Sequence, residues 1–400
     1  MSFTQLSSEF LSSFESYDDH EDVRRFELAD GIVAFIAVHN TNLGPALGGC
    51  RMTTYDSEAD AIHDVLRLSR GMTYKNAMAG LPLGGGKAVI IGNHRTEKTE
   101  ELMRSMGVAV QSFEGAYVTA EDSGTGEEDM VAMAAETPYV TGLPPEMLAG
   151  SEYGELGGNP SPLTALGCYE GIKATIAHRY KGAKTLKDMH IAIQGIGAVG
   201  LALGKLLKQD GAKLTIADIS EEGIATAKAE LGEVNVVGVD EIFSVEADIF
   251  APCAMGGALN DDTIAQLKCD IIAGAANNQL WKSHHDKVLL EKGILYVPDY
   301  VINSGGVICV GYEYFRKSEY NPQDFNIERG SMVAHVESVG KIVADILAES
   351  EARNLPTGET ADKLAEERFI KGAALGNNSD DANEEDPTNS AQSGGMTMVQ

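Results

Sequence analysis

The chain has 400 residues, with 31 Lys and Arg against 60 Asp and Glu, so its formal net charge is −29 at pH 7. The length is too great for one compact core and indicates two domains, while 43% hydrophobic and 23% charged residues exclude a disordered or fibrous chain. The negative charge argues against binding nucleic acid or an anionic membrane, because both need clustered Lys and Arg.

The sequence contains no run of about 18 apolar residues and no basic segment followed by an apolar one at its N-terminus. Its five cysteines are scattered and odd in number, which is typical of reduced thiols. His284 and His285 are adjacent, and adjacent residues on a helix do not face one ligand. We therefore expect a cytoplasmic protein without a transmembrane helix, a secretory signal or a bound metal.

Residues 1–145 predict a mixed α/β domain. Asp30-Gly31 is a hairpin turn signal between two apolar runs, and Ser57 with Asp60 forms a helix-capping pair. Gly71 is expected to end the helix that Ser57 begins, and the glycines at 84–86 are expected to form a turn. Further elements are expected at 88–92 (strand), 96–113 (helix) and 116–122 (strand).

Residues 146–330 predict a second, nucleotide-binding domain. The stretch 141–162 is dense in Gly and Pro, which indicates a hinge. Short apolar strands then alternate with helical segments, so we expect a Rossmann-type parallel sheet wound with helices on both faces. The expected strands are 190–194, 214–218, 248–252, 270–274 and 294–298. A helix over 331–370 is expected to pack back on the first domain, and the acidic tail 376–400 is expected to be disordered.

A dinucleotide fingerprint, G-x-G-x-x-G, is formed by Gly195, Gly197 and Gly200. It follows an apolar strand and opens an amphipathic helix, whose N-terminus attracts phosphates. Asp218 ends the next strand, where a carboxylate binds ribose hydroxyls and repels a 2′-phosphate, so NAD is favoured over NADP. The alternative is a glycine-rich turn with a solvated aspartate; the order of strand, turn, helix, strand and acid favours the cofactor site.

A second group of polar residues comprises Lys75, Lys87 and Asp122. Lys87 follows three glycines, but Leu81 and Ala88 stand where a phosphate-binding P-loop needs Gly and Ser or Thr, so that interpretation fails. Two amines and a carboxylate suit an α-amino acid: one cation for its carboxylate, one amine to activate water and one acid to move protons. From the residues alone, the alternative of solvated lysines and a helix-capping aspartate is slightly favoured.

Eight motifs in order resemble the Glu/Leu/Phe/Val family of amino acid dehydrogenases, in particular its leucine dehydrogenase branch. They lie at 41–52, 71–87, 119–125, 158–167, 194–200, 251–256, 275–280 and 298–308, and the resemblance covers roughly residues 20–370. It implies a reversible oxidative deamination of a branched-chain L-amino acid to the 2-oxo acid, ammonium and NADH. It also implies a homo-oligomer, often an octamer in that branch.

The resemblance further assigns roles to individual residues. Lys75 matches the lysine that binds the substrate carboxylate, Lys87 the lysine that activates water, and Asp122 the aspartate that moves protons. Gly48 and Gly49 match the backbone beside the substrate, and Thr164 and Asn277 match contacts to the nicotinamide end, with Asn278 as a competitor for Asn277. The residues that match the wall of the side-chain pocket are Leu47, Ala120, Val307 and Val310.

All four wall residues are apolar, so a glutamate side chain would leave a buried, unpaired carboxylate. For Val307 and Val310, simple helix packing is the alternative. The aliphatic amino acids differ by too little for sequence to rank them. Two other functions stay open: a dehydrogenase of the same fold that acts on phenylalanine or another aromatic amino acid, and a non-catalytic regulator that binds NAD.

Overall fold

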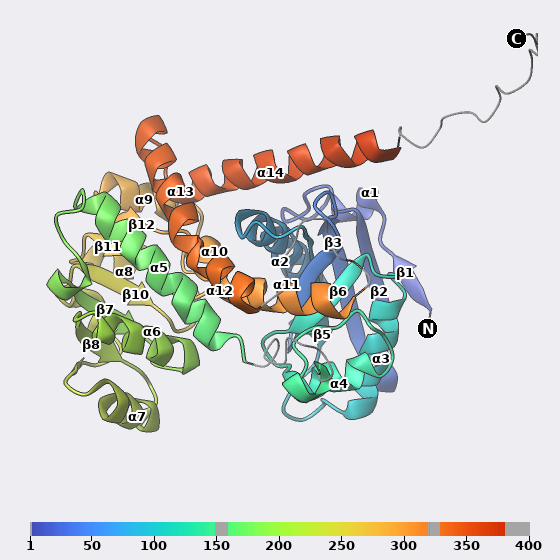
Figure 1. Cartoon of the computed structure of the whole chain (residues 1–400). Coiled ribbons are helices and arrows are strands. Elements are labelled where there is room, and N and C mark those ends of the chain that lie inside the picture. The colour runs from blue at the N-terminus through green and yellow to red at the C-terminus, as the bar shows by residue number, and fades with distance from the viewer. Residues whose placement is uncertain (1, 149–158, 319, 321–328, 381–400) are drawn as a thin grey trace, which may run out of the picture.

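The computed structural model describes residues 2–148, 159–318, 320 and 329–380. Within these ranges the chain folds into two lobes, each built on a six-stranded sheet (Figure 1). All five cysteines are free thiols. Every helix in the described part of the chain is too short or too polar to cross a bilayer.

The sheet of the first lobe runs in the order β1-β2-β3-β5-β4-β6. Its strands are β1 (Phe3–Gln5), β2 (Asp22–Glu27), β3 (Val33–Asn40), β4 (Ala46–Thr53), β5 (Gly84–Ile91) and β6 (Tyr117–Glu121). Strands β2 and β3 pair antiparallel around Asp30-Gly31, which confirms the predicted hairpin, whereas β4 is parallel to both β5 and β6. Helices α1 (Ser8–Leu11) and α2 (Glu58–Met78) bury one face of this sheet, and α3 (Glu100–Gln111) and α4 (Glu127–Ala134) bury the other.

Helix α2 begins where the sequence predicts, because the Ser57 hydroxyl accepts the backbone N–H of Asp60 at 3.2 Å. The prediction that it ends at Gly71 is wrong: the helix continues to Met78. Residues beyond the glycine are buried, and Asn76 donates its side-chain amide to the Gly84 carbonyl at 2.5 Å. Tertiary packing here outweighs the low helix propensity of one glycine, and the extra turns carry Lys75 to the helix end.

The prediction that the glycines at 84–86 form a turn is wrong. They are the first residues of buried strand β5. A Cβ atom at Gly85 would lie 2.0 Å from the Thr73 backbone nitrogen, and one at Gly86 would lie 2.6 Å from the Tyr117 ring. Glycine is therefore required by the close approach of α2 and β6. Lys87 consequently lies within a strand and is only 6% exposed, which rules out a solvated surface lysine.

The sheet of the second lobe runs in the order β12-β11-β10-β7-β8-β9, with every pair parallel. Its strands are β7 (His190–Gln194), β8 (Lys213–Ala217), β9 (Asn235–Val236), β10 (Ile249–Pro252), β11 (Ile271–Ile272) and β12 (Leu295–Tyr296). The layers are closed by helices α5 (Ser161–Arg179), α6 (Ala198–Gln209), α7 (Glu221–Leu231), α8 (Asp261–Gln266) and α9 (His285–Glu291). Separate cores lie on the two faces of the sheet, which confirms the doubly wound fold; the two-residue strand β9 was not predicted.

The C-terminal quarter of the chain joins the two lobes. It comprises α10 (Asp299–Ile302), α11 (Gly305–Lys317), α12 (Arg329–Glu337), α13 (Val339–Arg353) and α14 (Thr357–Asp380). Helix α11 returns to the first lobe, where the buried Glu313 carboxylate accepts the backbone N–H groups of Gly142 and Leu143 at 3.0 and 3.1 Å. Helix α13 packs against α5, and α14 crosses to α2 (Figure 1).

The stretch predicted as one helix over 331–370 is thus divided among three helices. Arg368 of α14 donates to the carbonyls of Ala77 and Met78 at 2.9 Å, at the C-terminal end of α2. The backbone of α14 continues to Asp380, so the first residues of the predicted tail are helical. The rest of that tail, 381–400, and most of the predicted hinge, 149–158, lie outside the described residues.

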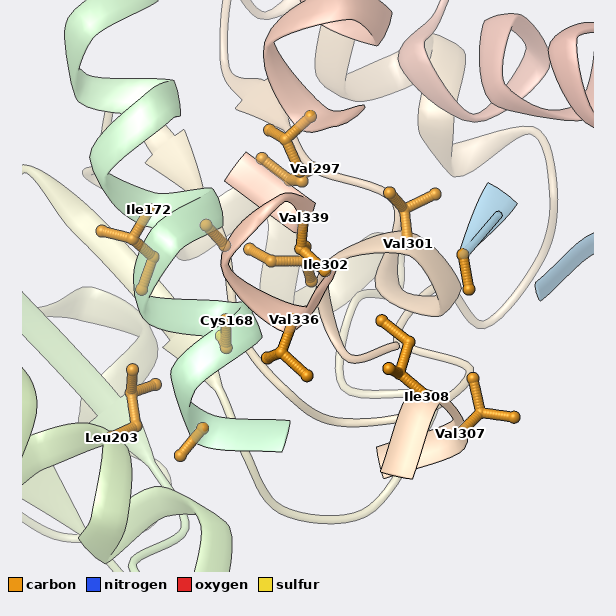
Figure 2. Packing of buried hydrophobic residues seen from close by; sticks show 14 of the residues in the cluster. Cys168, Ile172, Leu203, Val297, Val301, Ile302, Val307, Ile308, Val336 and Val339 are labelled. Atoms are coloured by element: carbon orange, nitrogen blue, oxygen red, sulfur yellow. The ribbon is translucent and has the colours of Figure 1, made fainter. Parts of the chain in front are cut away.

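An apolar core runs beneath the boundary between the lobes. Figure 2 shows part of it, with Ile172 and Cys168 of α5 on one side, Ile302, Val336 and Val339 in the middle, and Val307 and Ile308 on the other side. The first turn of α11 is therefore fixed by packing on the second lobe, while its later turns lie against Leu81 and Leu83 of the first. This double anchorage fixes the wall of the site described next.

Candidate active site

A cavity of about 320 Å³ lies between the two lobes. The candidate residues that line it are Leu47, Gly48, Gly49, Lys75, Lys87, Ala120, Asp122, Asn277, Val307 and Val310. They come from β4, α2, β5, β6 and α11 and from the loop after β11. A wider groove of about 1100 Å³ shares Arg67, Asn278, Asp299 and Tyr300 with this cavity. Lys75 and Lys87 are not part of its lining.

Lys87 and Asp122 form a close ion pair, with 2.6 Å between Lys87 Nζ and Asp122 Oδ2. Strand β4 lies between their strands, and a Cβ atom at Gly49 would lie 2.9 Å from the Asp122 Cβ. The neighbouring Gly48 is equally constrained, since a Cβ there would lie 1.7 Å from the Gly86 carbonyl oxygen. The two glycines thus allow the aspartate to approach the lysine across a strand.

Asp122 is held as a carboxylate. Burial alone would raise the pKa of Asp122, but the Lys87 ammonium and the Arg51 guanidinium hold it well below the usual range. The Asp122 backbone N–H is bound by the Thr125 hydroxyl at 3.0 Å, so this residue is tied into its loop rather than capping a helix. The predicted alternative of a capping aspartate is therefore wrong.

Lys75 enters the same cavity from the last turn of α2. Its Nζ donates to Asn303 Oδ1 at 2.7 Å, and Asn303 Nδ2 donates to Asn277 Oδ1, also at 2.7 Å. Burial lowers the pKa of Lys75 to about 8; Asp299 opposes that shift and Lys87 adds to it. A half-buried ammonium between two lobes, bound here by a neutral amide oxygen, can receive a small carboxylate.

Asn303 is a residue that the sequence reasoning missed. It lies at the end of α10, is 3% exposed, and links Lys75 of the first lobe to Asn277 of the second. Its neighbours in 298–308 were singled out as a motif, but nothing in the spacing marked this asparagine. Asn278 also lines the cavity, but it makes neither of these two bonds.

The apolar wall of the cavity is formed by Leu47, Ala120, Val307 and Val310. Val307 is also part of the buried core, and Val310 packs against that core. These two valines therefore pack in or against the core and also line the cavity. Leu68 and Met72 of α2 extend the apolar wall, and sequence reasoning had not included them.

The three fingerprint glycines and Asp218 lie on the second lobe, outside the lining of this cavity. Gly195 has φ of +90°, and a Cβ atom at Gly200 would lie 2.2 Å from its carbonyl oxygen. Gly197 begins α6 and has no atom within 4 Å of a Cβ position, which leaves room for a ligand at the helix N-terminus. Asp218 accepts the N–H groups of Ile196 and Ser220 at 2.7 and 2.8 Å, so it also fixes the glycine loop.

Three further residues bear on cofactor binding by the second lobe. Thr164 lies against Gly306, which lines the cavity: a Cβ atom at Gly306 would be 2.7 Å from the Thr164 hydroxyl oxygen. Ile219 and Met255 are 91% and 86% exposed beside Asp218 and the glycine loop respectively. Two large apolar side chains exposed to water in this region offer a surface for a flat apolar ring, and neither was predicted from the sequence.

The two adjacent histidines do converge, with Asp261, so that ligand atoms of all three lie within 4.8 Å of one another. The two rings can approach one point, contrary to the expectation for adjacent helical residues, because His284 precedes helix α9 instead of lying within it. However, His285 Nδ1 accepts the Lys282 N–H at 3.1 Å, so the ring proton lies on Nε2, which is 3.2 Å from Asp261 Oδ1. That pattern is a satisfied hydrogen-bonded histidine, and we assign no metal to it.

Comparisons with known proteins agree on one family. Residues 20–139 match the family model "Glu/Leu/Phe/Val dehydrogenase, dimerisation domain", and residues 214–371 match "Glutamate/Leucine/Phenylalanine/Valine dehydrogenase". Leucine dehydrogenase of Bacillus cereus is 46% identical over 364 residues, covering 91% of this chain and 94% of that protein. Phenylalanine dehydrogenase of Caldalkalibacillus thermarum is 41% identical over 368 residues, covering 91% and 95%.

A solved structure gives the same result. The crystal structure of L-tryptophan dehydrogenase from Nostoc punctiforme superposes with a TM-score of 0.73 at 38% sequence identity, and the match covers 88% of this chain and 97% of that one.

Proposed function

Because this chain belongs to the Glu/Leu/Phe/Val dehydrogenase family of oxidoreductases, we propose that it catalyses the NAD-dependent, reversible oxidative deamination of a branched-chain L-amino acid. The substrate would be leucine, with valine and isoleucine as alternatives, and the products the 2-oxo acid, ammonium and NADH. The observation that carries this proposal is the convergence of Lys75, Lys87 and Asp122 on one cavity with an apolar wall.

Each polar group has a defined task in this proposal. Lys75 pairs with the substrate carboxylate, replacing its bond to Asn303. Asp122, held ionised, accepts a proton from the substrate ammonium and so frees the nitrogen lone pair. Once the α-carbon has lost its hydride and become an iminium, the Lys87 amine orients and deprotonates a water that attacks this carbon. Asp122 then returns its proton to the nitrogen, which leaves as ammonia while the new hydroxyl loses its proton and becomes the carbonyl. Bound NAD would accept the hydride from the α-carbon.

The residues of the second lobe fit this cofactor. The open N-terminus of α6 at Gly197 suits the pyrophosphate, Asp218 suits the adenosine ribose, and Ile219 with Met255 suits the adenine ring. Asn277 and Thr164 lie toward the cavity and would bind the nicotinamide end. Residues 20–139 of this chain match the dimerisation domain of the family. We therefore propose a homo-oligomer, and by resemblance an octamer. Light scattering measures its mass in solution.

The apolar wall favours an aliphatic side chain. A second carboxylate, as in glutamate, would be buried against Leu47, Val307 and Val310 without a partner, at a cost above the roughly 2–7 kcal/mol of an unpaired neutral polar group. A panel of L-leucine, L-valine, L-isoleucine, L-phenylalanine, L-tryptophan and L-glutamate, assayed with NAD, tests this by kcat/KM. The aliphatic acids should lead; a higher value for an aromatic acid would move the protein to the other substrate class, and NAD binding without turnover would indicate a regulator.

Cofactor choice should depend on the charge of Asp218. We expect Asp218→Asn to lower the NAD to NADP ratio of kcat/KM by at least tenfold, because the repulsion of a 2′-phosphate is removed while an oxygen remains to bind the Ile196 N–H. Steady-state rates with both cofactors measure the ratio. A parent enzyme that uses NADP as well as NAD would refute the role given to this aspartate.

Binding of a carboxylate ligand should weaken as pH rises through about 8. Lys75 is charged below its pKa of about 8 and neutral above it, so the ammonium that attracts the carboxylate is lost on the alkaline side. Titration calorimetry with 4-methylpentanoate and NADH should show a dissociation constant that rises about tenfold per pH unit above pH 8. In Lys75→Arg the rise should vanish, because guanidinium stays charged; an unchanged rise would assign it to another group.

A further inference from the structure

Arg51 completes the ion pair of the candidate active site. It lies on β4, lines the cavity, and its Nε is 3.0 Å from Asp122 Oδ2, the same oxygen that receives Lys87 Nζ. The side chain is 18% exposed, so this contact is largely shielded from water. One carboxylate oxygen is thus shared by two cations from adjacent strands.

The guanidinium is itself held from behind. Its NH1 group is 3.2 Å from Asp64 Oδ2, and that same oxygen accepts the Tyr55 hydroxyl at 2.7 Å. The other oxygen of Asp64 lies 2.6 Å from an NH2 group of Arg67. Arg51 therefore stands between two carboxylates and cannot turn away from Asp122 without breaking a second ion pair.

The two cations beside Asp122 differ in chemistry. Lys87 must lose and regain a proton in the proposed function, and its attraction for the carboxylate falls whenever it is neutral. Arginine stays protonated in proteins, so its attraction persists through the whole cycle. The other charged or titratable groups near Asp122 are Lys75, Glu121, Cys50 and Tyr117, and none of them replaces a fixed cation.

We propose that Arg51 is a positioning residue of the deamination reaction, which keeps Asp122 ionised and facing Lys87 while the lysine changes its protonation state. This inference rests on the proposed function. Tyr55 and Asp64 act through Arg51 by fixing its orientation. None of the three residues is assigned contact with the substrate.

The test compares pH profiles of kcat/KM for the best amino acid of the panel in Arg51→Met, Arg51→Lys and the parent. Without the Arg51 cation, Asp122 takes up a proton at a higher pH than in the parent. Because the deamination needs Asp122 ionised, the activity of the variant is lost at a higher pH as the solution is acidified. In Arg51→Met we expect kcat to fall at least tenfold and the acidic limb to move up by about one pH unit or more. Arg51→Lys should restore part of both.

Arg25→Met is the matched control, because Arg25 makes a two-point ion pair with Glu58 at 2.8 and 2.7 Å from the same sheet, away from the cavity. A folded Arg51→Met enzyme with the parental pH profile would overturn the inference. If that variant does not fold, Tyr55→Phe provides the test, since it removes only the hydrogen bond from Tyr55 to Asp64, which holds Arg51. An acidic limb of the Tyr55→Phe profile identical to the parent's would also overturn the inference. A parent inactive on all amino acids would instead refute the proposed function.

Discussion

Lys87→Met is expected to lower kcat for deamination by about 10²–10⁴-fold without weakening NAD binding. Methionine fills a similar volume in a position that is 6% exposed, so the strand should keep its packing. The amine that activates water is lost, and the partner of Asp122 on strand β5 is lost with it. Rates of NADH formation measure kcat, and titration calorimetry measures NAD binding.

Lys98→Met is the control for this substitution. Lys98 makes an ion pair of 2.7 Å with Asp129 in the same lobe, but it does not line the cavity. Its removal should leave kcat within about twofold of the parent, because neither Lys98 nor Asp129 lines the cavity. Ordinary turnover by the Lys87 variant would contradict the role of this lysine, and an equal loss in both variants would indicate a general effect on the lobe.

Lys75→Met is expected to lower kcat/KM by about 10²–10³-fold, because the buried carboxylate of the substrate loses its cationic partner. The loss should appear in binding as well as in turnover. The inhibition constants of 4-methylpentanoate and of 4-methylpentanol separate the carboxylate from the rest of the ligand. The acid should bind the parent more tightly than the alcohol.

In the Lys75 variant that preference should disappear, since only the acid interacts with the ammonium. Asn303→Ala provides the comparison, because it removes the amide that binds Lys75 but leaves the charge. The acid should still be preferred there. A preference for the acid that survives in Lys75→Met would place the carboxylate site elsewhere in the cavity.

The parts of the fold that sequence predicts well are those set by local pattern. Strand β7 occupies the predicted 190–194, and the Ser57 cap begins α2, because a short apolar run and a capping hydroxyl act over a few positions. The failures come from contacts between distant segments. Gly71 does not end α2 and the glycines at 84–86 are not a turn, since both positions are decided by packing of α2 on β5.

The candidate site divides in the same way. The fingerprint glycines and Asp218 follow a local pattern, and the structure places them at the start of α6 and the end of β8. Asn303 and Arg51 were not predicted, because their partners Lys75 and Asp122 lie 228 and 71 residues away in the sequence. Ile219 was not predicted, because its exposure to solvent is visible only in the structure. Lys75, Lys87 and Asp122 were ambiguous by chemistry alone and became candidates through a resemblance over the whole chain.

Transfer of deuterium tests most directly whether the α-carbon of an aliphatic amino acid meets the cofactor between the lobes. The enzyme is incubated with L-leucine carrying deuterium at the α-carbon and with NAD, and the reduced cofactor is examined by mass spectrometry. We predict that the nicotinamide ring acquires the deuterium, with 4-methyl-2-oxopentanoate and ammonium formed in equal amounts. Reduced cofactor without the label, or none at all with any aliphatic amino acid, would contradict the account.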